Sequence, residues 1–113
     1  MRELTLSPWG LPAAYALHCP DCGGNFLHHT EIKVFLNNSG SRGKCDVVSI
    51  TDKTPINFTR RVALDNPSND RDGLLIRFYC EFCPAEPVLA IYQHKGQTVI
   101  EWVEKPLTDT KVA

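Results

Sequence analysis

Apolar and polar residues alternate along several stretches of this chain, which is the pattern of β-strands. In residues 31–36, Ile32, Val34 and Leu36 fall on one side of an extended chain. Glu31, Lys33 and Phe35 fall on the opposite side. A second β-rich run follows at residues 45–51, after a stretch dense in Asn, Ser and Gly, which tolerate turn geometry. We therefore predict a hairpin with a long loop.

The second half of the chain also contains predicted strands joined by turns. Residues 74–80 (LLIRFYC) predict a strand, and residues 88–93 and 98–104 flank the short turn segment HKGQ as a hairpin. Between the two halves, Pro55 interrupts the pattern, and residues 65–73 (DNPSNDRDG) are rich in turn formers. The sequence predicts a turn over 65–73 and no firm strand over residues 52–61.

The two ends of the chain carry weaker signals. Residues 11–18 (LPAAYALH) are the best helix candidate, because Pro12 suits a first helical turn, but they span only about two turns. We expect residues 1–16 to form an N-terminal arm and residues 106–113, which lack an apolar period, to be a frayed tail. The predicted fold is mainly β, an antiparallel sheet in a single domain of residues 1–113.

Composition fits one globular domain. The chain has 113 residues, 42% of them hydrophobic and 22% charged, with a formal net charge of -1. That balance supplies no long-range attraction to phosphate backbones or anionic lipid. The first residues are broken by Pro8, Gly10 and Pro12 and lack the continuous apolar core of a secretory signal. We expect a cytoplasmic protein without a membrane span.

Four of the five cysteines form two CxxC pairs, CPDC at 19–22 and CEFC at 80–83. Two intervening residues let a tight turn aim both thiolates at one ion, and Zn²⁺ prefers four such ligands in a tetrahedron. We expect Cys19, Cys22, Cys80 and Cys83 to bind a structural Zn²⁺ that staples one edge of the sheet. Iron suits the same four thiolates, so the two metals stay open. A redox CxxC and a disulfide framework are the remaining alternatives.

The cysteine turns resemble the zinc knuckles of zinc-ribbon and rubredoxin-like proteins. In CPDCGG, Gly23 and Gly24 permit the backbone to point N–H groups at sulfur. In CEFCPA, Pro84 stands where the knuckle usually has Gly, so we expect that half to be less regular. The stretches HCPDCGGNFLHHTEIKVF, DGLLIRFYCEFC and IYQHKGQT also look like small zinc-ribbon proteins of unassigned function in bacteria and phages. That resemblance implies a bacterial or phage cytoplasmic setting and offers no activity to carry over.

Other residues whose side chains could bind a metal or act in catalysis have simpler interpretations. His18, His28 and His29 lie near the first CxxC, but four thiolates already saturate zinc. Cys45 could act as a nucleophile only with a base such as His94, and a free Cys is more often a small buried hydrophobe. Residues 69–73 (NDRDG) resemble a calcium loop but lack its last acidic ligand. We therefore expect a turn in which the Asn and Asp side chains of residues 65–73 hydrogen-bond their own backbone and Arg71 reaches back to them.

Basic and aromatic residues mix on the predicted strands, as they do in protein interfaces and on single-stranded nucleic-acid binding faces. The candidates are Arg60, Arg61, Arg77, Tyr79, Tyr92, His94, Lys95 and Trp102. The first hypothesis is a zinc-stabilised β domain that is not an enzyme and binds a protein. The alternative is a nucleic-acid-binding zinc ribbon acting as a regulatory or accessory factor, and an enzyme using zinc or Cys45 is a third class. A homo-oligomer would pair through the exposed edge of the 91–102 hairpin.

Overall fold

The structure, a computed structural model, describes residues 2–37 and 43–104, and these residues contain strands and turns without a helix. Within those ranges there is accordingly no helix that could cross a membrane. The strands are β1 (Leu6–Pro8), β2 (Tyr15–Leu17), β3 (Leu27–Leu36), β4 (Lys44–Thr51), β5 (Asn57–Val62), β6 (Gly73–Cys80), β7 (Val88–His94) and β8 (Gln97–Trp102). The mainly β, antiparallel prediction is confirmed.

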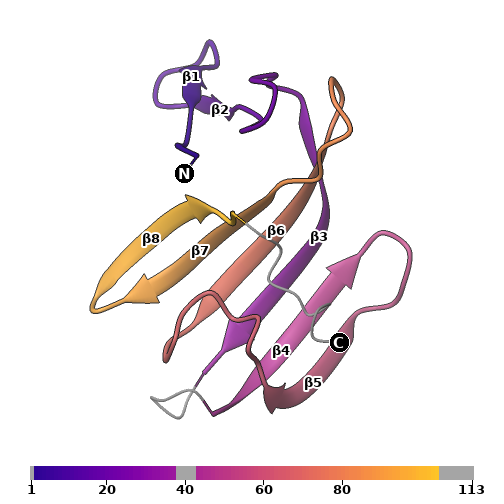
Figure 1. The fold of residues 1–113 in the computed structure, drawn as a ribbon, viewed down its shortest axis with the longest axis vertical. Coiled ribbons are helices and arrows are strands. Elements are labelled where there is room, and N and C mark those ends of the chain that lie inside the picture. Colours follow the sequence, from indigo (N-terminus) through magenta and orange to yellow (C-terminus); the bar gives the residue numbers. More distant parts are fainter. Residues whose placement is uncertain (1, 38–42, 105–113) are drawn as a thin grey trace.

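Six strands form one antiparallel sheet in the order β5-β4-β3-β6-β7-β8 (Figure 1). Each half is a three-stranded meander, and the halves join where β3 pairs with β6 along Leu27↔Cys80 to Phe35↔Gly73. Both predicted hairpins are confirmed, β3–β4 and β7–β8. β5 lies in the stretch for which the sequence predicted no firm strand, because its pattern NFTRRV has no apolar period and its pairing with β4 defines it.

The helix candidate at residues 11–18 is wrong. β1 and β2 pair in a separate two-stranded sheet with Leu6↔Leu17 and Pro8↔Tyr15, and the chain reverses between them. Ala13 has a φ of 64°, which ends any right-handed helical turn there. The expected N-terminal arm is therefore a small hairpin, which Figure 1 shows beyond the ends of β3 and β6. The predicted frayed tail, 106–113, lies outside the described residues.

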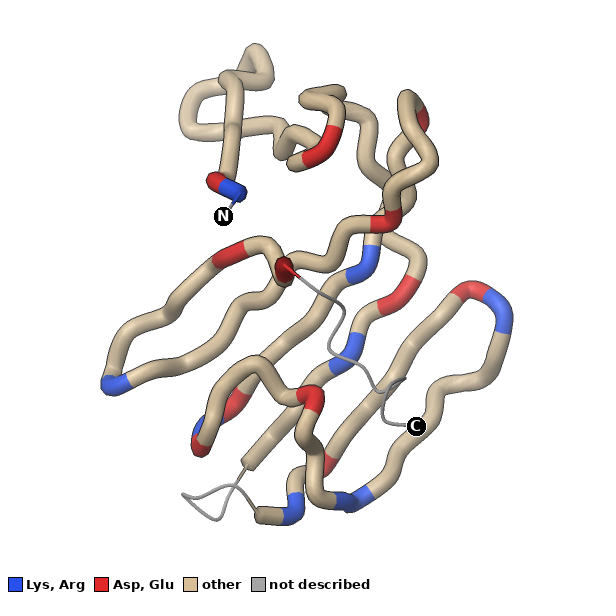
Figure 2. The backbone as a smooth tube through the Cα atoms, in the orientation of Figure 1, with Lys and Arg blue, Asp and Glu red and all other residues tan. Residues whose placement is uncertain are grey.

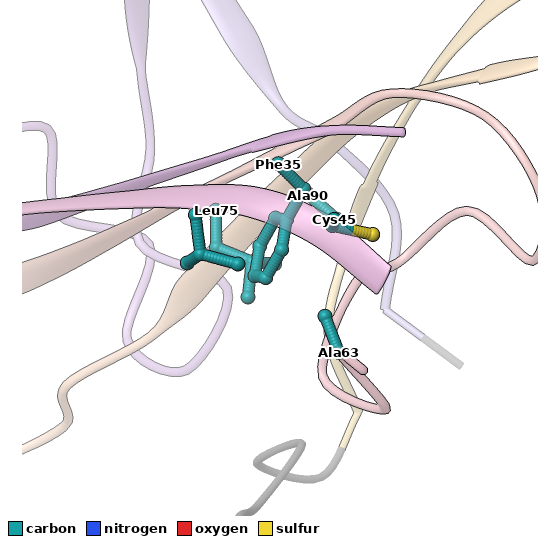
Figure 3. Packing of buried hydrophobic residues seen from close by; sticks show 6 residues of the cluster. Phe35, Cys45, Ala63, Leu75 and Ala90 are labelled. Carbon is teal, nitrogen blue, oxygen red and sulfur yellow. The ribbon is translucent and has the colours of Figure 1, made fainter. Parts of the chain in front are cut away.

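The buried core lies on the side of the sheet that carries Phe35. Its cluster contains Phe35, Cys45, Val47, Ala63, Leu75 and Ala90, and Phe35 is fully buried (Figure 3). The loop of residues 63–72 covers this face. A Cβ on Gly73 would collide with Asn66 and Pro67, so only glycine allows the loop to lie this close to β6. The loop thereby replaces the second layer that a sheet face needs.

Ionic contacts hold the loop in place. Asp65, whose side chain is 9% exposed, accepts hydrogen bonds from both terminal nitrogens of Arg61, at 2.9 and 3.1 Å, and from Lys33 Nζ at 3.2 Å. Burial alone would raise the pKa of Asp65, but the hydrogen bond from Arg61 and the charges of Lys33 and Arg61 outweigh it and lower that pKa. Ser68 Oγ donates to the Gln93 carbonyl of β7 at 2.9 Å.

Candidate metal centre

The four paired cysteines meet at one end of the sheet, where their sulfur atoms all lie within 4.8 Å of one another. Cys19 Sγ is 3.9 Å from Cys83 Sγ, and Cys22 Sγ is 3.6 Å from Cys80 Sγ. A tetrahedral Zn²⁺ with Zn–S bonds of about 2.3 Å requires sulfur atoms about 3.8 Å apart. A disulfide would require about 2.05 Å, and all five cysteines are free thiols. The sulfur cage therefore has the dimensions of a four-thiolate metal site.

We call the two cysteine turns, residues 19–24 and 80–85, the first and the second knuckle. The first knuckle is a tight turn closed by backbone hydrogen bonds. Gly23 N–H donates to the Cys19 carbonyl at 2.9 Å, and Cys19 N–H donates to the Gly24 carbonyl at 2.7 Å. Gly23 has a φ of 83°, a conformation that side chains with a Cβ rarely adopt. Gly24 N–H points at Cys22 Sγ over 3.4 Å. The two glycines therefore divide the predicted role: Gly23 alone has the positive φ that turns the backbone, and Gly24 alone aims its N–H at sulfur.

The second knuckle reaches its sulfurs by a different set of donors. Phe82 N–H lies 3.4 Å from Cys80 Sγ, and Cys83 N–H also contacts that sulfur. Pro84 has no N–H with which to close the turn as Gly23 does. Ala85 N–H hydrogen-bonds Cys83 Sγ instead, in the place of Gly24 in the first turn. Both sulfurs of this half therefore accept backbone N–H groups, although Pro84 has none to donate.

Contacts between the two knuckles fix them opposite each other. Glu81 N–H donates to the Phe26 carbonyl at 3.1 Å, which continues the β3–β6 pairing past Cys80. The rings of Phe26 and Phe82 pack with their centroids 5.5 Å apart. A Cβ on Gly24 would collide with the Phe82 ring, so this glycine lets the second knuckle approach the first. The register of β3 and β6 therefore delivers the four sulfurs to one point.

Backbone N–H groups, burial and the neighbouring thiols shift the pKa values of three of the four cysteines. The N–H of Phe82 is the main cause that lowers the pKa of Cys80, to about 7. The N–H of Ala85 favours the thiolate of Cys83, but burial and the three neighbouring thiols outweigh it and raise the pKa of Cys83 to about 12. For Cys22, the N–H of Gly24 is likewise outweighed by burial and Cys80, which raise its pKa. Four thiolates this close repel one another unless a cation neutralises them.

The histidines near the first knuckle support the cage from outside. His18 Nδ1–H donates to the Gly23 carbonyl at 2.7 Å, and the Ser7 hydroxyl lies 2.8 Å from its Nε2. His18 thus links the first knuckle to the β1–β2 hairpin. His28 pairs with the Glu81 carboxylate and stacks on Tyr79 at 5.3 Å between centroids. These interactions occupy the His18 and His28 rings, in agreement with the interpretation that sulfur supplies the ligands.

Cys45 lies in the buried core, far along the sheet from the four-sulfur cage. Its Sγ is 3.9 Å from Asn66 Nδ2 and 3.8 Å from the Gly43 carbonyl, and the residue is 3% exposed. The interpretation of Cys45 as a small buried hydrophobe is confirmed.

In the 65–73 turn, Asn66 bonds the backbone of its own loop as expected, whereas the side chain of Asp72 accepts from the N–H of Asn37, outside the turn. Asn66 Oδ1 accepts from Ser68 N–H at 3.0 Å, and Asn66 Nδ2 donates to the Arg71 carbonyl at 2.9 Å. Arg71 itself bonds the Asp70 carbonyl. These side chains therefore build the loop.

The structure distributes the partner-binding candidates over both faces of the sheet and one turn. Arg60 pairs with Asp46 on one face, whereas Arg61 pairs with Asp65 and Arg77 with Glu31 on the face that carries the core. Tyr92 donates to Glu101 at 2.8 Å, and Tyr79 stacks on His28. Trp102 is 3% exposed, and its Nε1 has no hydrogen-bond partner among the described residues. His94 and Lys95 lie at the β7–β8 turn. These eight residues do not gather on one surface.

Sequence reasoning missed the exposed apolar surface of the β1–β2 hairpin. Its members are Leu6, Trp9, Leu11 and Tyr15, which are between 53% and 62% exposed. The sequence contained a signal for this surface. Its large apolar residues lie in a stretch that Pro8, Gly10 and Pro12 interrupt too often for a strand or helix that would bury them in a core. Four large apolar residues exposed within one short hairpin make this hairpin a candidate protein contact site.

Comparison with protein-family models, with curated protein sequences and with solved structures finds no match to this chain.

Proposed function

We propose that this chain is a β domain whose knuckle end is held together by a structural Zn²⁺ and that acts by binding a protein, without catalysis. The observation that carries the proposal is the four-sulfur cage with tetrahedral dimensions. Cys19, Cys22, Cys80 and Cys83 would hold the ion. Four thiolates fill the shell of zinc, whereas catalytic zinc keeps a position for water or substrate. Bound zinc would neutralise the crowded thiolates and fix the two knuckles together.

Metal analysis tests the site. We expect untagged protein, expressed with zinc and iron both supplied, to contain one equivalent of zinc by mass spectrometry. Cys80→Ser should lose most of it, because a serine hydroxyl is a poor zinc ligand at neutral pH. Cys45→Ala is the matched control, since it removes a thiol of the same chain that is no member of the cage, and it should keep the full equivalent. Iron with visible charge-transfer absorption would replace zinc in the proposal, and no bound metal would overturn it.

Charge pairing favours a protein over a nucleic acid as the partner. Arg60, Arg61 and Arg77, the arginines that would meet phosphate groups, each form an ion pair with a carboxylate. Figure 2 shows acidic and basic positions interspersed along the described backbone. Nucleic-acid affinity depends on basic groups that can replace condensed counterions. The exposed Trp9 and Tyr15 of the hairpin are, in contrast, the residue types that anchor protein interfaces.

A binding experiment separates the two partner classes. The immobilised zinc-loaded chain is exposed to an extract of its source organism, and a retained protein is then measured as a purified partner. We expect the double variant Trp9→Ala/Tyr15→Ala to weaken that binding at least tenfold, and Leu64→Ala, at a residue 75% exposed, to leave it unchanged. We expect no salt-dependent binding of a fluorescent mixed-sequence single-stranded DNA, that is, no binding at 50 mM salt that weakens at 200 mM. Salt-dependent DNA binding would favour the nucleic-acid alternative.

A further inference from the structure

The face of the sheet opposite the buried core is apolar across its full width. The register places Phe58, Val48, Val34, Leu74, Ile91 and Ile100 in one row that crosses all six strands. The adjacent row contains Ile50, Ile32, Ile76, Leu89 and Trp102. We call these two rows the open face.

The 63–72 loop covers the other side, and most of the open face is only partly buried, although Leu89 (7% exposed) and Trp102 (3%) are buried at its β7–β8 end. Phe58 is 60% exposed, Ile100 48% and Ile50 40%, while the central residues shelter one another only partly. A sheet with two apolar faces needs a layer on each.

We propose that the open face is the interface of a homodimer in which two copies pack face to face as a β-sandwich. The two rows of the open face and the polar row beside them, on six strands about 4.8 Å apart, measure about 24 Å by 20 Å. Two copies would then bury about 1,000 Å² together, at the lower limit of a specific interface. A second copy also carries the same twist, and two sheets of equal twist pack closely when aligned.

The polar groups beside the open face are arranged for pairing with themselves. A third row contains Arg60, Asp46, Leu36, Gln93 and Thr98, in which Arg60 bonds Asp46 at 2.6 Å and Gln93 bonds Thr98 at 2.9 Å. A twofold axis parallel to the strands, passing between β3 and β6, places every row opposite its own copy in reverse order. Apolar rows then meet apolar rows, and the charged pair of β4 and β5 meets the amide and hydroxyl of β7 and β8. In this arrangement Phe58 of one copy contacts Ile100 of the other.

Sedimentation of the zinc-loaded full chain tests the proposal. We expect a dimer at micromolar concentration. Phe58→Glu and Ile100→Lys should each raise the dissociation constant at least tenfold, because each places a charge against the apolar row of the second copy. Leu64→Glu is the matched control at an exposed residue of the loop on the other side, and it should leave the dimer intact. Circular dichroism of each variant confirms that the sheet still forms.

Mixing the two weakened variants tests the alignment itself. In the mixed dimer, the introduced carboxylate faces the introduced ammonium, while the second Phe58–Ile100 contact keeps its original residues. We therefore expect the mixture to recover the dimer, although neither variant dimerises well alone. A wild-type chain that stays monomeric at 100 micromolar overturns the proposal, as does a dimer indifferent to both substitutions, which would indicate pairing along the β8 or β5 edge. Loss of the dimer without recovery on mixing overturns the proposed twofold arrangement.

Discussion

At the scale of single residues, Asp65 connects the covering loop to the sheet. Its carboxylate is nearly buried and receives hydrogen bonds from Arg61 and Lys33, which belong to two strands of the sheet. Its charge is therefore favourable in the folded chain only because both cations are in place. In the sequence, Asp65 is one of several turn residues. Its ion pair with Lys33 could not be predicted, because the two residues are 32 positions apart in the chain.

Replacing this carboxylate should weaken the fold. Asp65→Asn leaves Lys33 and Arg61 without their counter-charge, and we expect a loss of about 1–3 kcal/mol of unfolding free energy at pH 7. Urea unfolding measures it. Asp70→Asn, at an exposed residue of the same loop, is the control and should change the stability by less than about 0.5 kcal/mol.

The lowered pKa of Asp65 also predicts a pH dependence. A carboxyl whose folded pKa is below its unfolded value stabilises the fold above the unfolded pKa, near 3.8, and this contribution is lost as the pH falls through the lower folded pKa. We expect wild-type stability to fall more steeply below about pH 4 than that of Asp65→Asn. Parallel curves for the two chains would show that the ion pairs carry no net stability.

At the scale of elements, the β7–β8 turn shows how a local sequence sets strand register. Lys95 and Gly96 have φ values of 51° and 84°, so the two-residue turn has positive φ at both central positions. Such turns match the twist of the strands they connect. The segment HKGQ was recognised as a turn from its composition, and the structure adds that Lys95 adopts a conformation better suited to Asn.

Substitutions in this turn should therefore act in opposite directions. Gly96→Ala forces a Cβ into the left-handed region and should cost about 1 kcal/mol. Lys95→Asn should stabilise the chain by a few tenths of a kcal/mol, because Asn tolerates that region. Thermal unfolding of the two variants measures both effects. A gain on Gly96→Ala would contradict the turn geometry.

At the scale of the whole molecule, the four-sulfur cage and the apolar core lie at opposite ends of the sheet. Cys80 pairs with Leu27 at the start of β3, whereas Phe35, at the centre of the core, pairs with Gly73 at the start of β6. The cage connects the two knuckles and the β1–β2 hairpin. The core and the 63–72 loop hold the other end without it.

Removal of the proposed Zn²⁺ should consequently loosen one end of the molecule. We expect chelation to abolish hydrogen-exchange protection in residues 2–26 and 80–87, while β3, β4, β6 and β7 keep theirs in the part that carries the core. Mass spectrometry of exchange with and without chelator, at equal protein concentration, measures this. Uniform loss of protection over all strands would mean that the metal holds the entire fold.

The sequence by itself determined the strands of strong apolar period and the cysteines of the cage. These features follow from local rules, since a period of two defines a strand and a two-residue spacing aims two sulfurs at one point. β5 and the β1–β2 hairpin escaped prediction because their pairing with neighbouring strands defines them. Only the tertiary structure decided which face is covered. Phe35 stands among charged neighbours in β3, yet its face is the buried one, because the 63–72 loop returns over it through Gly73 and Asp65. Ile32 and Val34, which follow the more regular apolar period, are only partly buried, because coverage depends on contacts between residues far apart in the chain.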